Sequence, residues 1–195
     1  MEQPRQGGGN PPNIGIVCGY GIVPDKRLRS YCKTVAGSVI AQKIEILILT
    51  GGHTIEDAPE TEARVVWEIM RPQLPNCSFV FEERSLSTLH NLLYAKNILD
   101  KYNVSMNLLY VFCDSVRYMK VVCLSKIIFT GYAVRVVKCE RKEPLFMYVL
   151  QIPFTLLQCV GAVFPPVEKL FFQGRRFVRK QYAATAVKTQ SHKKS

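Results

Sequence analysis

Four polar residues at regular spacing follow a short apolar run near the middle of the chain. These residues are Glu82, Ser85, Thr88 and Asn91. A step of three residues places side chains on one face of a helix. We therefore expect a carboxylate, two hydroxyls and an amide to gather near a helix N-terminus, where they could hydrogen-bond a small ligand. Ser85 is also a typical helix N-cap residue, so a purely structural role for it stays open.

Glycines follow two other apolar runs, at the positions Gly19, Gly21, Gly51 and Gly52. Glycine lets the backbone approach a ligand closely. A helix is predicted after each of these turns, and a helix N-terminus favours an anionic group such as phosphate or carboxylate. An ordinary tight turn is the alternative for the pair Gly51 and Gly52.

Three charged residues complete the candidate site. Arg117 is expected in the first turn of a helix, from which its guanidinium could bind an anionic group through two hydrogen bonds. A solvated helix face is the alternative for this arginine. Glu62 is expected in the first two turns of another helix, facing either inward or outward. Asp114 follows a fourth apolar run.

Strand-like and helix-like segments alternate along the chain. The predicted strands cover residues 14–18, 44–50, 78–82, 106–112 and 133–139. The predicted helices cover residues 27–42, 57–70, 87–102 and 116–129. This alternation predicts an α/β fold, a Rossmann-like parallel sheet of about five strands with helices on both faces. The carboxyl ends of parallel strands share one edge of the sheet, so the candidate residues should converge there.

Local signals predict where the helices begin and which faces they bury. Asp57 starts a sequence typical of a capping box, with a proline early in the first turn. Helical spacing predicts that 27–42 buries Leu28, Cys32, Val35, Val39 and Ile40. The core candidates of 87–102 are Leu89, Leu92, Leu93, Ala95, Ile98 and Leu99.

Familiar catalytic and metal-binding motifs are not found in the sequence. It has no phosphate-binding loop of the P-loop type, no nucleophile elbow, no complete dinucleotide fingerprint and no zinc-ligand spacing. We therefore predict no metal and assign no catalytic residue. Cys113 beside Asp114 could be a nucleophile with His53 as its partner, and a buried structural cysteine is the alternative. Seven cysteines without a CxxC pair indicate a reducing compartment, so we expect a cytoplasmic protein.

The composition divides the chain into four parts. Residues 1–13 are predicted to be a flexible arm, 14–143 a ligand-binding domain, 144–173 an apolar helical segment and 174–195 a basic disordered tail. Residues 175–195 carry seven of the net +11 charges and no acid. Such a tail is either simply solvated or able to touch an anionic membrane surface. Nucleic-acid binding is not expected, because the body of the protein has no basic face.

The segment 145–163 contains no charged residue, but it includes Pro153 and two glutamines. Its length is close to the roughly 20 apolar residues of a membrane span. Three alternatives are open: a helix packed on the domain, an interfacial or re-entrant membrane segment, and a true span. Membrane association through residues 145–195 is therefore a second functional hypothesis, as a non-catalytic protein of the cell envelope or endomembranes.

Several of these motifs resemble a domain of unknown function that bacterial SanA, ElyC and YdcF proteins share. That family has a glycine pair after its second strand, a Glu-Ala pair opening the next helix, and a Glu-x-x-Ser-x-x-Thr-x-x-Asn string. The matching positions are Gly51-Gly52, Glu62-Ala63, the string Glu82, Ser85, Thr88 and Asn91, and Arg117. The resemblance covers about residues 14–140.

The resemblance implies a polar pocket for a small nucleotide-like or phosphate-bearing ligand, for which S-adenosylmethionine has been proposed within the family. It also implies that a weak transferase or hydrolase activity could accompany binding. Asp114 stands where the family usually has a histidine. If that histidine takes part in chemistry, this chain would bind a ligand without converting it.

Overall fold

A computed structural model describes residues 11–53, 58–141 and 143–164 of the chain. The strands are β1 (Asn13–Val17), β2 (Ile44–Thr50), β3 (Ser78–Glu82), β4 (Leu109–Asp114) and β5 (Val134–Cys139). The helices are α1 (Lys26–Ala41), α2 (Glu62–Met70), α3 (Thr88–Lys101), α4 (Tyr118–Ile128) and α5 (Leu145–Val163), with a short 3-10 turn at Arg71–Gln73. Residues 1–10 of the predicted arm (1–13) and the predicted tail lie outside the described residues, and Asn13, the last residue of that arm, belongs instead to β1.

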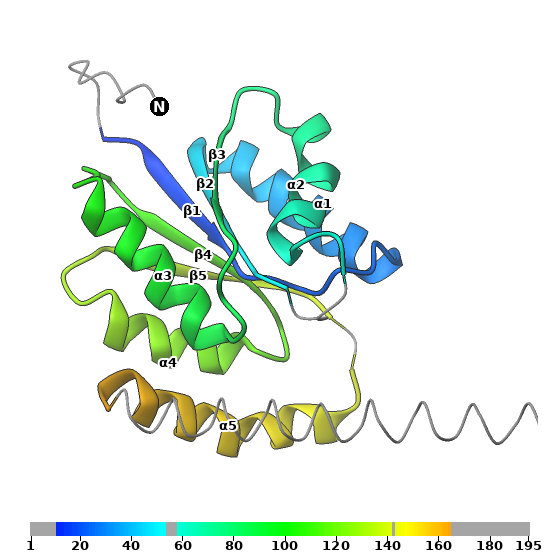
Figure 1. Cartoon of the computed structure of the whole chain (residues 1–195), viewed down its shortest axis with the longest axis vertical. Coiled ribbons are helices and arrows are strands. Elements are labelled where there is room, and N and C mark those ends of the chain that lie inside the picture. Colours follow the sequence, from blue (N-terminus) through cyan, green and yellow to red (C-terminus); the bar gives the residue numbers. More distant parts are fainter. Residues whose placement is uncertain (1–10, 54–57, 142, 165–195) are drawn as a thin grey trace, which may run out of the picture.

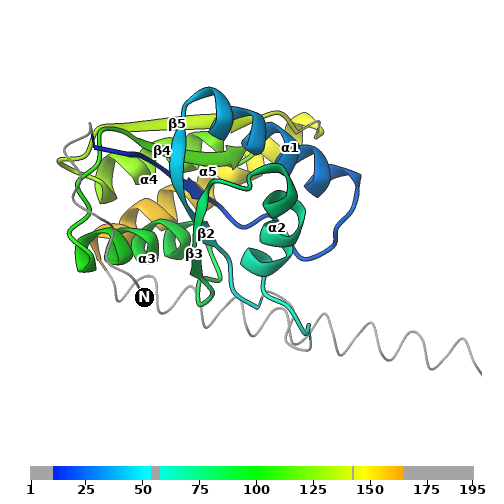
Figure 2. The ribbon, with the colours of Figure 1, turned by 90° about the horizontal axis from the view of Figure 1, so that it is seen from above.

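The strands of the described chain form one parallel sheet in the order β3-β2-β1-β4-β5. Helices α1 and α2 cover one face, and α3 and α4 cover the other (Figures 1 and 2). This is the doubly wound arrangement of α/β proteins, so the predicted Rossmann-like fold is confirmed.

The register of the central strands separates two hydrophobic cores. Val17 of β1 lies beside Leu49 of β2 and Phe112 of β4, and all three belong to the core under α1 and α2. Ile16, the preceding residue, belongs to the core under α3 and α4. Successive side chains of a strand alternate between its faces, so an apolar run with no polar interruption fits a strand buried on both sides.

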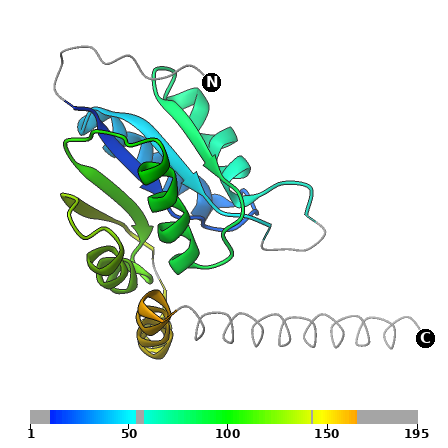
Figure 3. The same ribbon diagram turned by 60° about the vertical axis from the view of Figure 1, so that its left-hand side comes forward.

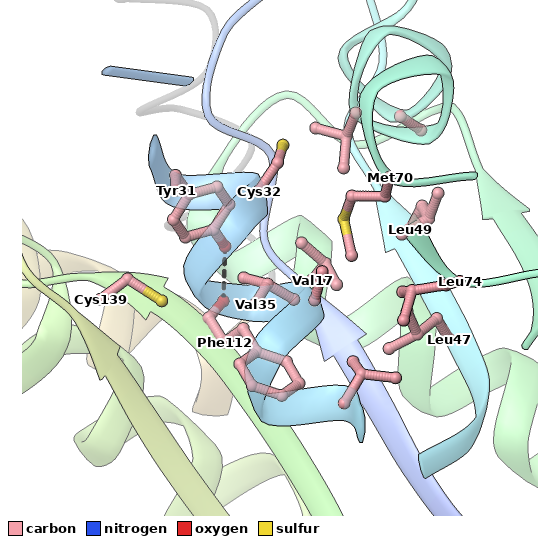
Figure 4. Packing of buried hydrophobic residues seen from close by; sticks show 14 of the residues in the cluster. Val17, Tyr31, Cys32, Val35, Leu47, Leu49, Met70, Leu74, Phe112 and Cys139 are labelled. Carbon is pink, nitrogen blue, oxygen red and sulfur yellow. Dashed lines mark hydrogen bonds between the residues drawn. The ribbon is translucent and has the colours of Figure 1, made fainter. Parts of the chain in front are cut away.

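Tyr31 of α1 shows how the first core meets the carboxyl edge of the sheet. Its ring lies among the buried side chains of that core (Figure 4). Its hydroxyl donates to the carbonyl oxygens of Cys18 (3.2 Å) and Phe112 (3.1 Å). One side chain therefore bonds to the ends of β1 and β4 together.

Three local predictions are wrong in detail. Helix α2 begins at Glu62 with Thr61 as its N-cap, and residues 58–61 are not helical; Asp57 lies outside the described residues. Ile40 is exposed, because it faces away from the sheet near the end of α1. In α3, Leu93 and Ile98 are only half-buried, while the other four predicted core residues are buried.

Helix α5 lies outside the sandwich, beside α4, as Figure 3 shows in an almost end-on view. It is long and apolar enough to cross a membrane by length and composition alone, and only about a tenth of that stretch is buried in the protein. The helical state predicted for this segment is confirmed, and its contacts with α4 are those of a helix packed on the domain. Residues 165–173 of the predicted apolar segment lie outside the described residues.

Candidate functional site at the carboxyl edge of the sheet

Loops after neighbouring strands meet at the carboxyl edge of the sheet. The strand order reverses between β1 and β4, and in doubly wound sheets the crevice outside such a reversal is the usual ligand site. Gly19 follows β1 and Arg117 follows β4. The Nη1 atom of Arg117 donates to the carbonyl oxygen of Gly19 at 2.8 Å, across this reversal. The predicted convergence of these two loops is therefore confirmed.

Glycines allow the first two loops to pack against Glu62. A Cβ at Gly19 would meet Oε2 of Glu62 and lie 2.9 Å from the carbonyl oxygen of Thr50. A Cβ at Gly51, where φ is +141°, would lie 2.6 Å from the Cβ of Glu62. Gly21 has a positive φ but open space around it, so the turn alone requires it. Glu62 is 9% exposed, which resolves its orientation as inward.

Gly52 joins the second and third loops. Its N–H donates to the carbonyl oxygen of Ser85 at 2.8 Å. A Cβ at Gly52 would lie 2.6 Å from the carbonyl oxygen of Glu83, closer than real Cβ atoms come. The glycine pair thus serves as the tight, closely packed turn that the sequence left as an alternative.

The N-terminus of α2 uses its first amide donors within the protein. The N–H groups of Glu62 and Ala63 donate to the carbonyl oxygens of Gly52 (3.3 Å) and Gly51 (3.1 Å). The next N–H donates to the Thr61 hydroxyl. These donors are not directed at an open crevice, so the prediction of an anion site at this helix terminus is weakened.

Asn91 connects the third loop to the first. Oriented by its surroundings, its amide oxygen accepts from the N–H of Gly19 at 3.3 Å, and its nitrogen donates to Oγ of Ser85 at 2.6 Å. Ser85 and Thr88 are buried with it. The N-cap of α3 is Ser87, whose hydroxyl accepts a hydrogen bond from the N–H of His90. Ser85 is therefore not the N-cap of α3 but a buried hydrogen-bond partner of Asn91, and its role in ligand binding stays a prediction.

Glu82 ends β3 with one oxygen satisfied and one not. Its Oε1 accepts from the N–H groups of Arg84 (2.8 Å) and Ser85 (3.1 Å), which shapes the turn. Its Oε2 is buried and has no hydrogen-bond partner among the described residues. A buried carboxylate oxygen without a donor is costly, because it has lost its water without replacement.

Arg117 and Asp114 form a buried ion pair. Arg117 is the N-cap residue of α4 and not a first-turn residue as predicted. Its Nε donates to Oδ2 of Asp114, and its own N–H donates to Oδ1 at 3.1 Å. Burial raises the pKa of Asp114, but attraction and hydrogen bonds from Arg117 outweigh this and leave the pKa below its ordinary value. Burial lowers the pKa of Arg117, but the charge of Asp114 together with the neighbouring thiol and phenol groups leaves this pKa above its ordinary value.

The nucleophile alternative for Cys113 is wrong. The side chain is fully buried in the core under α3 and α4, and burial raises its pKa well above the ordinary range. A thiol in this state is protonated, and the thiolate is the reactive form. His53 is exposed, and its Nδ1 contacts the carbonyl oxygen of Ala58 at 3.1 Å. Cys113 is therefore the structural cysteine that the sequence left as its alternative.

The structure adds an aromatic and basic wall that the sequence did not indicate. The guanidinium of Arg141 lies 5.3 Å from the ring centre of Tyr20, which stacks on Tyr31 at 4.7 Å. Ser115 and Tyr148 both donate to the carbonyl oxygen of Arg141, at 2.9 and 3.0 Å. These residues are far apart in the sequence and share no spacing, so no local signal could have grouped them.

A groove of about 540 Å³ lies between α1 and α2. Its lining residues are Ile22, Pro24, Arg29, Lys33, Val65, Glu68, Ile69, Pro72 and Gln73. The first two belong to the same loop as Gly19 and Gly21, so the groove begins near the carboxyl edge. Two cations and one acid line it, a second basic feature that the sequence analysis did not single out.

The cluster of charged side chains at the carboxyl edge contains more acidic than basic residues. Glu62, Glu82 and Asp114 are buried there, and Arg117 is paired with one of them. Within the described residues, no group of three or more histidine, cysteine or acidic side chains could hold a metal ion. The cluster therefore offers acceptors for hydrogen-bond donors more than it offers a clamp for an anion.

Comparisons of the chain with protein-family models, with curated proteins and with solved structures found no match.

Proposed function

We propose that the carboxyl edge of the sheet binds a small nucleotide-like or phosphate-bearing ligand, with S-adenosylmethionine as a candidate from the family resemblance. The observation that carries this proposal is Oε2 of Glu82, which is buried and has no partner among the described residues. It lies in the turn that also holds Ser85, the hydrogen-bond partner of Asn91. A ligand hydroxyl or amino group is the natural donor for such an oxygen.

The acidic part of the cluster defines what the ligand must present. Glu62 lies against Gly19 and Gly51, and no hydrogen bond to its carboxylate is found among the described residues. Glu62 and Glu82 together suit a ligand rich in N–H or O–H donors, such as a ribose with a free amino group. A ligand consisting of phosphate alone fits these two carboxylates poorly, because like charges repel.

Arg117 supplies the position for an anionic part of the ligand. Its described hydrogen bonds use Nε, Nη1 and the backbone N–H, which leaves Nη2 as a donor. Its side chain keeps 19% of its surface exposed. We expect one phosphate or carboxylate oxygen to bind Nη2, rather than the two-bond clamp that the sequence alone suggested.

The site supports binding better than turnover. Cys18, Cys113 and Cys139 lie at the ends of β1, β4 and β5, and burial raises the pKa of Cys18 to about 11 and those of Cys113 and Cys139 further. Asp114, at the position of the family histidine, is held by Arg117. A transferase or hydrolase activity would need a group activated by the ligand itself.

We also propose that the protein resides in the reducing cytosol. All seven cysteines are free, so no disulfide stabilises the fold. A domain of this kind keeps its thiols reduced in the cytosol.

The proposal is tested by ligand-dependent thermal stability of the purified protein, with nucleotides, S-adenosylmethionine and polyprenyl phosphates as probes. A ligand at about 100 times its Kd should raise the free energy of unfolding by about 2.7 kcal/mol. The Glu62→Gln variant keeps the shape of the side chain and should lose this protection. Glu68→Gln changes an exposed glutamate of the same helix and should keep it. Protection that survives in Glu62→Gln, or no protection by any probe, contradicts the proposed site.

A further inference from the structure

Helix α5 distributes its side chains in the opposite way to an ordinary surface helix. The side turned to the domain carries Tyr148, Gln151, Thr155 and Gln158, at steps of three and four residues. The outer side carries exposed aliphatic residues, among them Leu145, Val149, Leu150, Ile152, Leu156 and Val160. A surface helix of a globular protein normally buries its apolar stripe and exposes its polar one.

Polar contacts hold the inner side of α5 to the domain. The Tyr148 hydroxyl bonds to Ser115 Oγ at 3.1 Å and to the Arg141 carbonyl oxygen at 3.0 Å. Nζ of Lys120, a buried residue of α4, donates to Oε1 of Gln151 at 2.6 Å. Gln158 is also buried. Tyr148 and Gln151 lose these partners if α5 leaves the domain.

The same contacts argue against a helix that crosses a bilayer. A spanning α5 would carry Gln151 into hydrocarbon without the bond from Lys120 of α4, and Gln158 without its cover from the domain. Each unsatisfied polar group there is costly. A helix that keeps these contacts and buries only its outer side in lipid gives the polar inner side its hydrogen bonds and the apolar outer side an apolar environment.

The chemistry of the outer side favours lipid over a protein partner. No charged residue occurs from Leu145 to Phe164, and the exposed large side chains of this stretch are aliphatic residues and the phenylalanines Phe146, Phe154 and Phe164. Protein interfaces carry roughly one hydrogen bond per 100–200 Å² and a polar rim, for which this side offers no side-chain groups. Acyl chains require none.

The flanking charge indicates which lipid surface. Lys138 and Arg141, which precede α5, are paired with Glu140 and Glu143. The unbalanced positive charge comes from residues 175–195, which add seven basic residues and no acid, beginning eleven residues after Phe164. A basic segment beside an apolar helix face is attracted to anionic headgroups, and the apolar face then enters the boundary between headgroups and acyl chains.

We propose that α5 lies flat on an anionic membrane surface, with its apolar outer side in the lipid and its polar inner side bonded to α4. Helix α5 starts close to the carboxyl edge of the sheet, through Tyr148 and Ser115, and runs along the outside of α4 (Figure 1). The membrane would therefore pass near the rim of the proposed ligand site. The proposal does not depend on that site being occupied.

Flotation of the full-length protein with vesicles tests the proposal. The vesicles contain phosphatidylcholine alone or phosphatidylcholine with phosphatidylserine. The protein should float with the anionic vesicles, and added salt should weaken this binding without abolishing it. In the double variant Val149→Gln with Leu156→Gln, the affinity for anionic vesicles should fall by more than about tenfold, because two exposed aliphatic residues no longer enter the lipid. Ile40→Gln, which changes an equally exposed residue of α1, should bind like the wild type.

Further measurements separate the remaining occupants of this surface. Unchanged melting curves of the double variant show that loss of binding is not loss of folding. A C-terminal tag on vesicle-bound protein should stay accessible to protease, whereas protection of the tag overturns the flat orientation in favour of a span. Equal vesicle binding by wild type and double variant overturns the role of α5.

The wild type could instead form a dimer that binds no vesicles. If the double variant dissociates this dimer, the surface binds a second copy of the chain and not lipid. If the wild type is monomeric and binds no vesicles, the proposed lipid contact is also rejected. Residues 165–195 of the same chain are then the segment left to cover the outer side of α5.

Discussion

The carboxyl edge of the sheet and the outer side of α5 are opposites in polarity and burial. At the edge, Glu82, Asn91 and Asp114 are buried although they are polar. On α5, residues such as Leu145 and Leu156 are exposed although they are apolar. The first region must satisfy its polar groups internally or with a ligand, and the second must find an apolar partner.

The difference between the two regions lies in what each still lacks. Many polar groups of the edge already have protein partners, whereas one buried oxygen of Glu82 has none among the described residues. The α5 surface is open over the whole length of the helix. A small ligand therefore suits the edge, and an extended apolar phase suits α5.

The largest expected effect comes from breaking the ion pair at the edge. Asp114→Ala leaves Arg117, whose side chain is only 19% exposed, without its counter-charge, which should lower the free energy of unfolding by about 3 kcal/mol, the low end of the range for buried pairs. Urea denaturation measures this loss. Lys138→Ala removes one partner of the exposed pair with Glu140 and should leave the urea midpoint unchanged. Equal small effects of the two variants would show that the buried pair contributes no more than a surface pair.

The same pair predicts a dependence of stability on pH. The pKa of Asp114 is lowered in the folded protein, so its contribution is complete above the unfolded pKa, about 3.9. The contribution is lost as the pH falls through the lower folded pKa, because the folded state then binds the proton less readily than the unfolded state. Urea midpoints measured between neutral pH and about pH 2 should therefore fall more steeply for the wild type than for Asp114→Asn. Parallel pH profiles would contradict this assignment.

A methyl group at Gly19 should have a smaller but clear effect. Gly19→Ala places a Cβ against Glu62 and the Thr50 carbonyl, and such overpacking costs about 1–3 kcal/mol. Gly37→Ala is the matched control in the interior of α1, where a Cβ meets nothing within 4 Å. It should stabilise the protein by up to about 1 kcal/mol, because alanine favours helix. Thermal unfolding of both variants checks the opposite signs.

The smallest effect concerns the inner side of α5. Gln158 is buried, and its Oε1 has no partner among the described residues. Gln158→Leu should therefore stabilise the domain by up to about 1 kcal/mol, since it removes an unsatisfied group. Gln151→Leu breaks the bond from Lys120 and should act in the opposite direction. Chemical denaturation that gives the two leucine variants the same sign would show that the inner side is not bonded as described.

The repeating pattern of apolar segments predicted most of the fold. The run Ile44–Thr50 agrees with β2 at both ends, because a strand buried on both faces is largely apolar; its one charged residue, Glu45, is exposed near the start. The predicted starts of the helices, where several side chains compete for the N-cap position, were less accurate. Thr61, not Asp57, caps α2, and Ser87, not Ser85, caps α3. Several residues near each helix start are able to cap, and the packing of the loops selects among them.

The candidate site was predictable as a meeting of loops but not as a set of contacts. Parallel strands bring Gly19, Asn91 and Arg117 to one edge, and spacing along the chain was enough to indicate that. The bond from Arg117 to the Gly19 carbonyl and the stacking of Arg141 near Tyr20 were not predictable. Such contacts join residues about a hundred positions apart, where no local period operates.

The sequence by itself determined the alternation of strands and helices, the buried character of the central strands and the uncharged helix that follows them. Each of these depends on the polarity of near neighbours, which the order of residues records directly. The tertiary structure alone decided that Arg117 reaches the Gly19 carbonyl and that the polar side of α5 faces α4. Those choices depend on which surfaces of distant segments fit together, and they are made only when the chain has packed.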